Sequence, residues 1–205
     1  ALSTSIYILF DTIFIGQGVG SLGLTALNIA LPIYSIYFGT GLLIGIGGST
    51  LMSIEKGRER EDKAQKIFTL SFVFGLILAI IYTIVGFVFL EEIAVILGAT
   101  KEVLPLVKEY MIVVVFGTIP FVMGSVMAPF IRADKAPKKA MFAVIFSGVL
   151  NIILDYIFVF PLKMGMKGAA IATVFSYTIS FLILLTHLLS KNNTLKFKSG
   201  FYKLT

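Results

Sequence analysis

Two acidic residues, Asp11 and Asp155, lie inside long apolar runs, whereas the rest of the 11 acidic residues lie in the polar gaps between such runs. A charged side chain at the centre of a bilayer costs about 2.5–3.5 kcal/mol on insertion scales, so acids at that depth are rare and usually functional. A carboxyl group in a dry site favours its neutral form and can bind and release a proton near neutral pH. Its oxygens can instead hold Na⁺, as in transporter sites near the membrane midplane. These two residues are therefore candidates for binding a coupling cation.

Polar residues share a helix face with the second of these acids. Ser147, Asn151 and Asp155 recur every four residues, which places them on one side of a helix. Thr173 and Tyr177 have the same spacing further along the chain. Cysteine is absent and only one histidine is present, which excludes thiolate metal sites and His-based metal clusters. With no evident pairing of a nucleophile with a base, we expect no enzyme activity and no cofactor beyond the coupling ion.

The composition predicts the elements that position these residues. Hydrophobic residues make up 58% of the chain and charged residues 14%, with a mean hydropathy of +0.99. A soluble domain has about 45–50% apolar and about 25% charged residues. The chain is therefore predicted to be an all-α integral membrane protein in contact with membrane lipid. The net charge of +6 does not indicate nucleic-acid binding, because the basic residues cluster between the apolar runs.

Six apolar runs occur along the sequence, and all but the first are long enough to cross a bilayer. A span needs about 20 apolar residues, so the first run is short, and we expect a transmembrane helix that lacks its beginning. Pro32 in the second run and Pro120 and Pro129 in the fourth mark places where helices can bend. The expected helices cover residues of about 1–16, 24–54, 67–90, 110–131, 140–161 and 168–189.

Lysine and arginine are distributed unevenly between the two sides of this arrangement. Most of the 17 basic residues lie in the gap 56–66, the gap 132–139 and the tail 191–203. All three segments fall on the same side if each run crosses the membrane once. By the positive-inside rule, that side is cytoplasmic, and both ends of the chain lie there. We expect the plasma membrane of a bacterium as the location.

Several other motifs have simpler interpretations. The G-x-G-x-x-G match at 18–23 follows a membrane helix and lacks a strand, so it predicts a turn rather than a dinucleotide site. The G-x-x-x-G match at 41–45 predicts close packing between helices of this chain. His187 lies near the end of the last run and is interpreted as an ordinary interfacial residue, although its titration range would permit a pH role. Residues 91–109 predict an outside connection with a short interfacial helix.

Three stretches of the sequence resemble the multidrug and toxic compound extrusion (MATE) family of antiporters, and the resemblance covers nearly the whole chain. The first leads from Asp11-Thr12-Ile13-Phe14-Ile15-Gly16 to Ala26-Leu27-Asn28-Ile29-Ala30-Leu31-Pro32. The second is Phe130-Ile131-Arg132-Ala133-Asp134-Lys135-Ala136-Pro137-Lys138. The third and most specific joins Asn151-Ile152-Ile153-Leu154-Asp155 to Met164-Gly165-Met166-Lys167-Gly168-Ala169-Ala170-Ile171-Ala172-Thr173. Tyr156 follows Asp155 where many relatives have proline, so a bend there is expected to be weaker.

The resemblance implies a fold of twelve helices in two lobes, of which residues 1–205 would form the amino-terminal six-helix lobe. It also implies export of cationic, amphipathic drugs or toxic compounds in exchange for H⁺ or Na⁺. The family's cation site of this lobe maps onto Asp11, Asn151, Asp155 and Thr173, with Tyr110 as a possible further member. The missing carboxy-terminal lobe, or a second copy of the chain, would be the required partner.

Two other functions remain open at this point. One is a lipid-linked oligosaccharide flippase of the same superfamily, which would need basic residues around an anionic substrate. No Lys or Arg lies deep in an expected span, which favours a cationic cargo. The other is a membrane subunit that acts as a scaffold and does not transport.

Overall fold

The computed structural model describes residues 2–198, with side chains from Leu9 onward, and every regular element in that range is an α-helix. This confirms the all-α prediction. The helices are α1 (Leu2–Gly18), α2 (Ser21–Gly57), α3 (Glu61–Val88), α4 (Leu90–Ile96), α5 (Leu104–Phe116), α6 (Thr118–Ala133), α7 (Pro137–Val159) and α8 (Gly165–Leu185).

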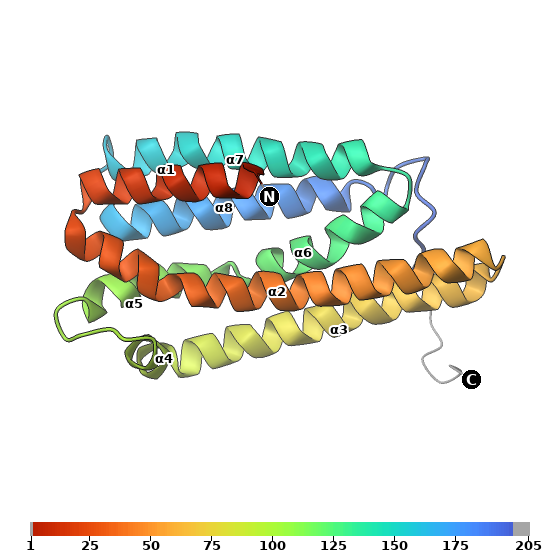
Figure 1. Ribbon diagram of the computed structural model, residues 1–205, viewed down its shortest axis with the longest axis horizontal. Helices are drawn as coiled ribbons and strands as arrows, with labels where there is room; N and C mark the ends of the chain where they lie inside the picture. The colour runs from red at the N-terminus through yellow and green to blue at the C-terminus, as the bar shows by residue number, and fades with distance from the viewer. Residues whose placement is uncertain (1, 199–205) are drawn as a thin grey trace.

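The long helices run along one common axis as a bundle (Figure 1). Helices α1, α7 and α8 form one side of it, and the hairpin of α2 and α3 forms the other (Figure 1). Helix α6 lies between the two sides and packs against α2, α3 and α8. Helices α1, α7 and α8, which carry candidate residues, therefore lie across α6 from the α2–α3 hairpin.

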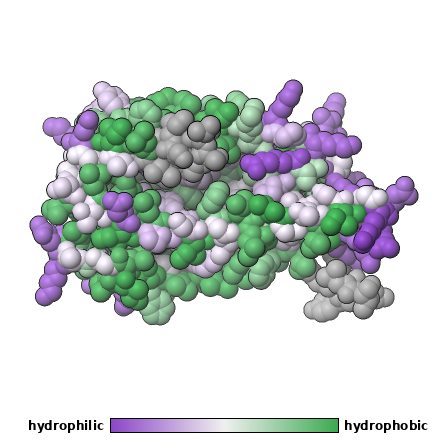
Figure 2. Space-filling view, viewed as in Figure 1, coloured by the Kyte–Doolittle hydropathy of each residue, from purple (hydrophilic) through white to green (hydrophobic). Residues whose placement is uncertain are grey.

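Four helices, namely α2, α3, α7 and α8, are long and apolar enough to cross a membrane, and α5 with α6 makes a fifth span that is bent. Helix α1 has 17 residues, which is near the lower limit for a span. Large apolar side chains point outward along the bundle, and Leu43, for example, is 75% exposed. Figure 2 shows hydrophobic residues along the length of the molecule and hydrophilic residues gathered toward its two ends. This pattern is that of a multi-pass membrane protein.

The fourth expected span is broken where its sequence predicts a bend. Helices α5 and α6 meet at Gly117 with an angle of 53° between them. Pro120 lies one turn beyond Phe116, so it has no N–H for the Phe116 carbonyl, and its ring crowds that carbonyl. Helices α2 and α6 continue through Pro32 and Pro129. A single proline in the first turn of α6 thus accounts for the break.

Three further local predictions are confirmed. The glycine-rich stretch at 18–23 contains the turn between α1 and α2, where Gly20 has a φ of 93° that favours glycine. Helix α4 is the short helix expected within 91–109. Gly41 and Gly45 lie directly against the backbone of α6, since a Cβ on Gly45 would be 2.7 Å from the carbonyl oxygen of Val126. This G-x-x-x-G motif serves packing inside the chain.

Candidate functional site

The two intramembrane acids come from different helices and meet in the interior. Asp11 on α1 is 6% exposed and Asp155 on α7 is 0% exposed. The carboxyl groups are close enough to interact electrostatically. Close packing of α1 on α7 brings them together, because a Cβ on Gly18 would lie 2.2 Å from Val159 Cγ1. Glycine at position 18 therefore allows the two helices to approach each other.

Asn151 and Thr173 join α7 to α8 beside the acids. Asn151 Nδ2 donates a hydrogen bond of 3.3 Å to Thr173 Oγ1, and both side chains are buried. Asn151 lies one helical turn before Asp155, so its amide shares that face of α7. The structure thus places four of the sequence-derived candidates, on α1, α7 and α8, in one region.

Several oxygens in this region are buried without a hydrogen-bond partner among the described residues. They are both carboxyl oxygens of Asp155, Asp11 Oδ1 and Asn151 Oδ1. Most buried polar atoms in proteins have a partner, and an exception usually indicates a functional group or a site for a water or an ion. All four atoms accept hydrogen bonds or coordinate cations unless a carboxyl is protonated. The arrangement can therefore bind a proton or a small hard cation.

A pocket of about 180 Å³ adjoins these residues. Asp11 forms part of its wall, so this residue both interacts with Asp155 and borders the pocket. Tyr34 donates a hydrogen bond of 3.1 Å from its hydroxyl to the hydroxyl of Tyr110. The rings of Phe121 and Tyr177 pack with centroids 4.0 Å apart. The lining residues are Asp11, Leu27, Leu31, Tyr34, Ser35, Phe38, Tyr110, Phe121, Thr173 and Tyr177.

A second cavity, of about 610 Å³, lies among α2, α6, α7 and α8. It shares Phe38, Phe121 and Tyr177 with the first pocket, so these rings separate the two spaces. Ser147 and Asn151 face this second cavity. The polar face predicted for α7 is therefore divided. Ser147 and Asn151 line the second cavity, whereas Asp155 lines neither cavity and interacts with Asp11 of α1.

Tyr34 and Phe121 are pocket residues that the sequence did not single out. Both lie in apolar helices rich in similar residues, and neither carries a charge or belongs to a spaced polar pattern. Tyr110, by contrast, was a possible site member and lines the pocket with its hydroxyl bonded to Tyr34.

Comparisons with known proteins identify the family to which this chain is similar. The family model described as MatE matches residues 1–157. The multidrug export protein MepA of Staphylococcus saprophyticus is 32% identical over 206 residues, which cover 100% of this chain and 46% of that protein. MepA of a Staphylococcus aureus strain is also 32% identical, over 193 residues, or 94% of this chain and 43% of its own. These names describe export rather than catalysis.

Solved structures of transporters share the fold. An inward-facing multidrug resistance MATE family transporter superposes with a TM-score of 0.88 at 26% identity, covering 95% of this chain and 44% of that one. A MOP superfamily transporter from Pyrococcus furiosus, described as having a binding pocket of reverse polarity, superposes with a TM-score of 0.83 at 29% identity, covering 94% of this chain and 42% of that one. The chain spans less than half the length of these relatives. The match to the family model over most of its length shows that the chain belongs to the MatE family.

Proposed function

We propose that this chain forms one lobe of a cation-coupled multidrug exporter, in which Asp155 binds the coupling H⁺ or Na⁺ together with Asn151, Asp11 and Thr173. The observation that carries the proposal is the group of buried oxygens without partners around Asp155. Buried acceptor oxygens without partners are stabilised most by a proton or a small cation. Either one compensates the negative charge of a carboxylate that water does not solvate.

The neighbouring pocket suits a cationic, amphipathic substrate. Tyr34, Phe38, Phe121 and Tyr177 offer aromatic surfaces, and Asp11 offers a negative charge. Aromatic faces attract organic cations, with about 2 kcal/mol or more gained when the pair is desolvated. None of the described residues that line the pocket is Lys or Arg. An anionic lipid-linked substrate is less suited to this wall, which argues against the flippase alternative.

Asp11 suggests how the cation and the drug would be exchanged. Its carboxyl group interacts with Asp155 and also faces the pocket. A cation bound between the acids neutralises the charge that would hold a cationic drug, so each ligand weakens binding of the other. Such coupling is reciprocal by thermodynamic linkage. Binding would also shift the equilibrium between conformations that differ in the packing of α1, α7 and α8.

Transport is expected to require more than this lobe. Alternating access in such transporters involves one half moving against the other, and the relatives are more than twice as long as this chain. A carboxy-terminal lobe or a second copy would supply the other half. We call the end of the bundle that carries the basic segments 56–66 and 132–139 the basic end. By the positive-inside rule, we assign this end to the bacterial cytoplasm. Cation-driven drug flux by a reconstituted monomer of this chain would overturn the requirement for a partner.

The experiment is efflux of ethidium, a cationic dye, from vesicles that contain the full-length transporter to which this chain belongs. Na⁺ and pH gradients are varied independently to identify the coupling ion. Asp155→Asn is expected to abolish cation-driven efflux, whereas Glu91→Gln changes an exposed acid that pairs with Lys108 at 2.6 Å and serves as the control. Unchanged efflux in Asp155→Asn would disprove the role of this residue. Cation binding that disappears in Asp155→Ala would also argue against the scaffold alternative.

A further inference from the structure

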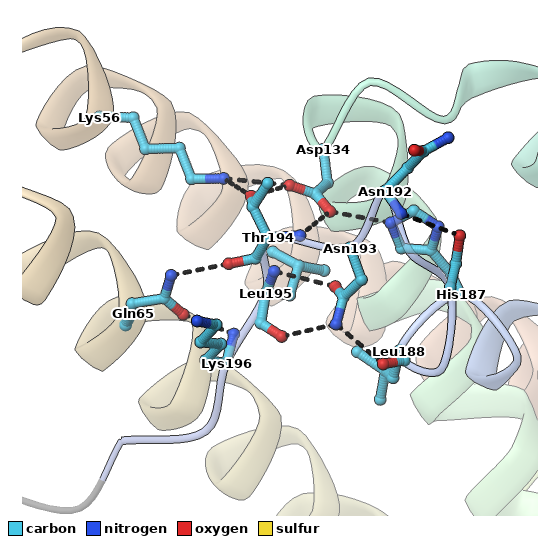
Figure 3. Close-up of polar contacts among 11 residues, drawn as sticks. Lys56, Gln65, Asp134, His187, Leu188, Asn192, Asn193, Thr194, Leu195 and Lys196 are labelled. Carbon is cyan, nitrogen blue, oxygen red and sulfur yellow. Dashed lines mark hydrogen bonds and ion pairs between the residues drawn. The ribbon is translucent and has the colours of Figure 1, made fainter.

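Asp134 is buried and lies at the centre of a polar network at the basic end of the bundle (Figure 3). It directly follows α6 and accepts hydrogen bonds from three other parts of the chain. Lys56 Nζ at the end of α2 lies 3.1 Å from Oδ1, and His187 Nε2 after α8 lies 2.8 Å from Oδ2. The backbone N–H of Thr194 donates to Oδ2 at 2.9 Å, and its hydroxyl donates to Oδ1. His187 is 1% exposed, so its interpretation as an ordinary interfacial residue is wrong.

The segment 190–198, which we call the strap, crosses from the end of α8 to α3. Gln65 on α3 donates from Nε2 to the carbonyl oxygen of Thr194 at 2.7 Å and accepts from the backbone N–H of Lys196 (Figure 3). The backbone N–H of Lys198 donates to Thr69 Oγ1 at 2.9 Å. Side chains of α3 thus supply hydrogen-bond partners for backbone groups of the strap, which does not form a helix.

Apolar contacts hold the strap in the same place. Leu195 is buried, and the ring of Phe197 packs on the rings of Phe68 and Phe72 with centroids 5.1 and 5.0 Å away. Phe68 in turn contacts Phe130 of α6, at 5.2 Å. The strap is therefore docked on the α2–α3 hairpin by both polar and aromatic contacts.

The charges around Asp134 favour its ionised form. Burial raises the pKa of Asp134, but hydrogen bonds from Thr194, His187 and Lys56 lower it by more than burial raises it. The pKa therefore lies below its ordinary value. Glu55, an acidic residue at the end of α2, is paired with Arg58 at 3.1 Å and Arg60 at 3.6 Å. Asp134 is thus a buried carboxylate that joins α2, α6, the end of α8 and the strap.

We propose that Asp134 is the latch of this strap, and that the latched strap fixes the position of the α2–α3 hairpin relative to the α7–α8 pair, across α6, at the basic end of the bundle. Helix α2 carries Tyr34 of the pocket, and α8 carries Thr173 and Tyr177. The separation of these helices at the basic end therefore affects the opposite walls of the pocket. Releasing the latch lets the hairpin move away from α7 and α8. This inference concerns a conformational restraint and does not depend on transport.

Spin labels on this chain test the latch, since the sequence contains no cysteine that would compete for the label. Lys196→Cys reports the mobility of the strap, because its exposed side chain lies outside the network. Lys63→Cys with Lys138→Cys, two exposed positions near the basic ends of α3 and α7, reports the separation of the hairpin from α7. Asp134→Asn is the test variant. Asp62→Asn is the matched control, because it removes only an exposed ion pair to Lys198 of the same strap.

In Asp134→Asn, the label at position 196 is expected to become mobile, and the distance distribution between positions 63 and 138 to broaden toward longer values. Asp62→Asn is expected to leave both signals as in the unmodified chain. An immobile strap in Asp134→Asn would overturn the proposal, and so would a mobile strap with an unchanged distance distribution. If Asp134→Asn does not fold, Thr194→Val removes the strap's hydroxyl, which donates to the Asp134 carboxylate and accepts from Lys56 Nζ, and it leaves the ion pair of Lys56 and the hydrogen bond of His187 to Asp134 in place. The same two signals then decide, with the same outcomes.

Discussion

Substitution of Gly45 by alanine tests how closely α2 and α6 must pack. A Cβ at this position would lie 2.7 Å from the carbonyl oxygen of Val126 and 2.8 Å from that of Ser125. Both atoms belong to the backbone of α6, so they cannot rotate away as a side chain would. Gly47, two residues further along the same helix, has nothing within 4 Å of such a Cβ and provides the matched control.

The two variants share every effect except this contact. Alanine is favoured over glycine inside a helix by about 0.8–1.0 kcal/mol, so Gly47→Ala is expected to be neutral or slightly stabilising. Overpacking a close contact costs about 1–3 kcal/mol. Because the three nearest atoms belong to the backbone of α6 and to the rigid ring of Pro129, the upper part of that range applies. Gly45→Ala is therefore expected to be less stable than Gly47→Ala by about 2–3 kcal/mol.

The assay is reversible unfolding in mixed detergent micelles, with helix content followed by circular dichroism. The difference in unfolding free energy between the two variants isolates the packing term, since the gain in helix propensity cancels. Equal stability of Gly45→Ala and Gly47→Ala would refute the inference that this motif brings two backbones together inside the chain.

Three further predictions concern other contacts. Pro120→Ala supplies an N–H for the Phe116 carbonyl, so the bend of 53° is expected to decrease, and an unchanged bend in a solved structure of the variant would contradict this explanation. Tyr110→Phe removes the acceptor of the partly buried Tyr34 hydroxyl and is expected to lower the unfolding free energy by about 1 kcal/mol; a variant as stable as the parent would refute it. The lowered pKa of Asp134 means that its carboxylate stabilises the fold above its unfolded pKa of about 3.9. This contribution is lost as pH falls through the lower folded pKa, so Asp134→Asn is expected to flatten the acid limb of a stability–pH profile, and an identical limb would argue against it.

The membrane spans were predictable because each one consists of a continuous apolar run. Their ends were less so, since polar residues extend several helices beyond those runs. Helix α3, expected from residue 67, begins at Glu61, where Glu61 and Asp62 lie in the first turn. Acidic residues are favourable at a helix N-terminus, so composition alone underestimates this helix.

The acid pair was predictable only in part. The burial of Asp155 follows from a carboxylate within an apolar run, and its spacing from Asn151 places both on one face. That Asp11 meets it depends on packing of α1 against α7, which no periodic pattern encodes. The resemblance to a family suggested that pairing, and in the structure the two carboxyl groups lie close enough to interact.

The network around Asp134 was not predicted. His187 lies near the end of an apolar run, and Asp134, 53 residues earlier in the chain, lies among basic residues of a polar segment. Such segments are normally solvated, so sequence pattern gives no reason to expect burial. The signal that could have indicated it is a lone acid between Arg132 and Lys135 on the side that carries most of the positive charge.

The central claim is that Asp155 forms a cation site with the oxygens around it. Its most direct test is ligand binding by the purified chain in detergent, with Na⁺ binding followed by calorimetry and proton uptake by a pH-indicator dye. The account predicts that one of these two cations binds to the unmodified chain and to Glu91→Gln, and that this binding disappears in Asp155→Asn. Binding that persists unchanged in Asp155→Asn would contradict it.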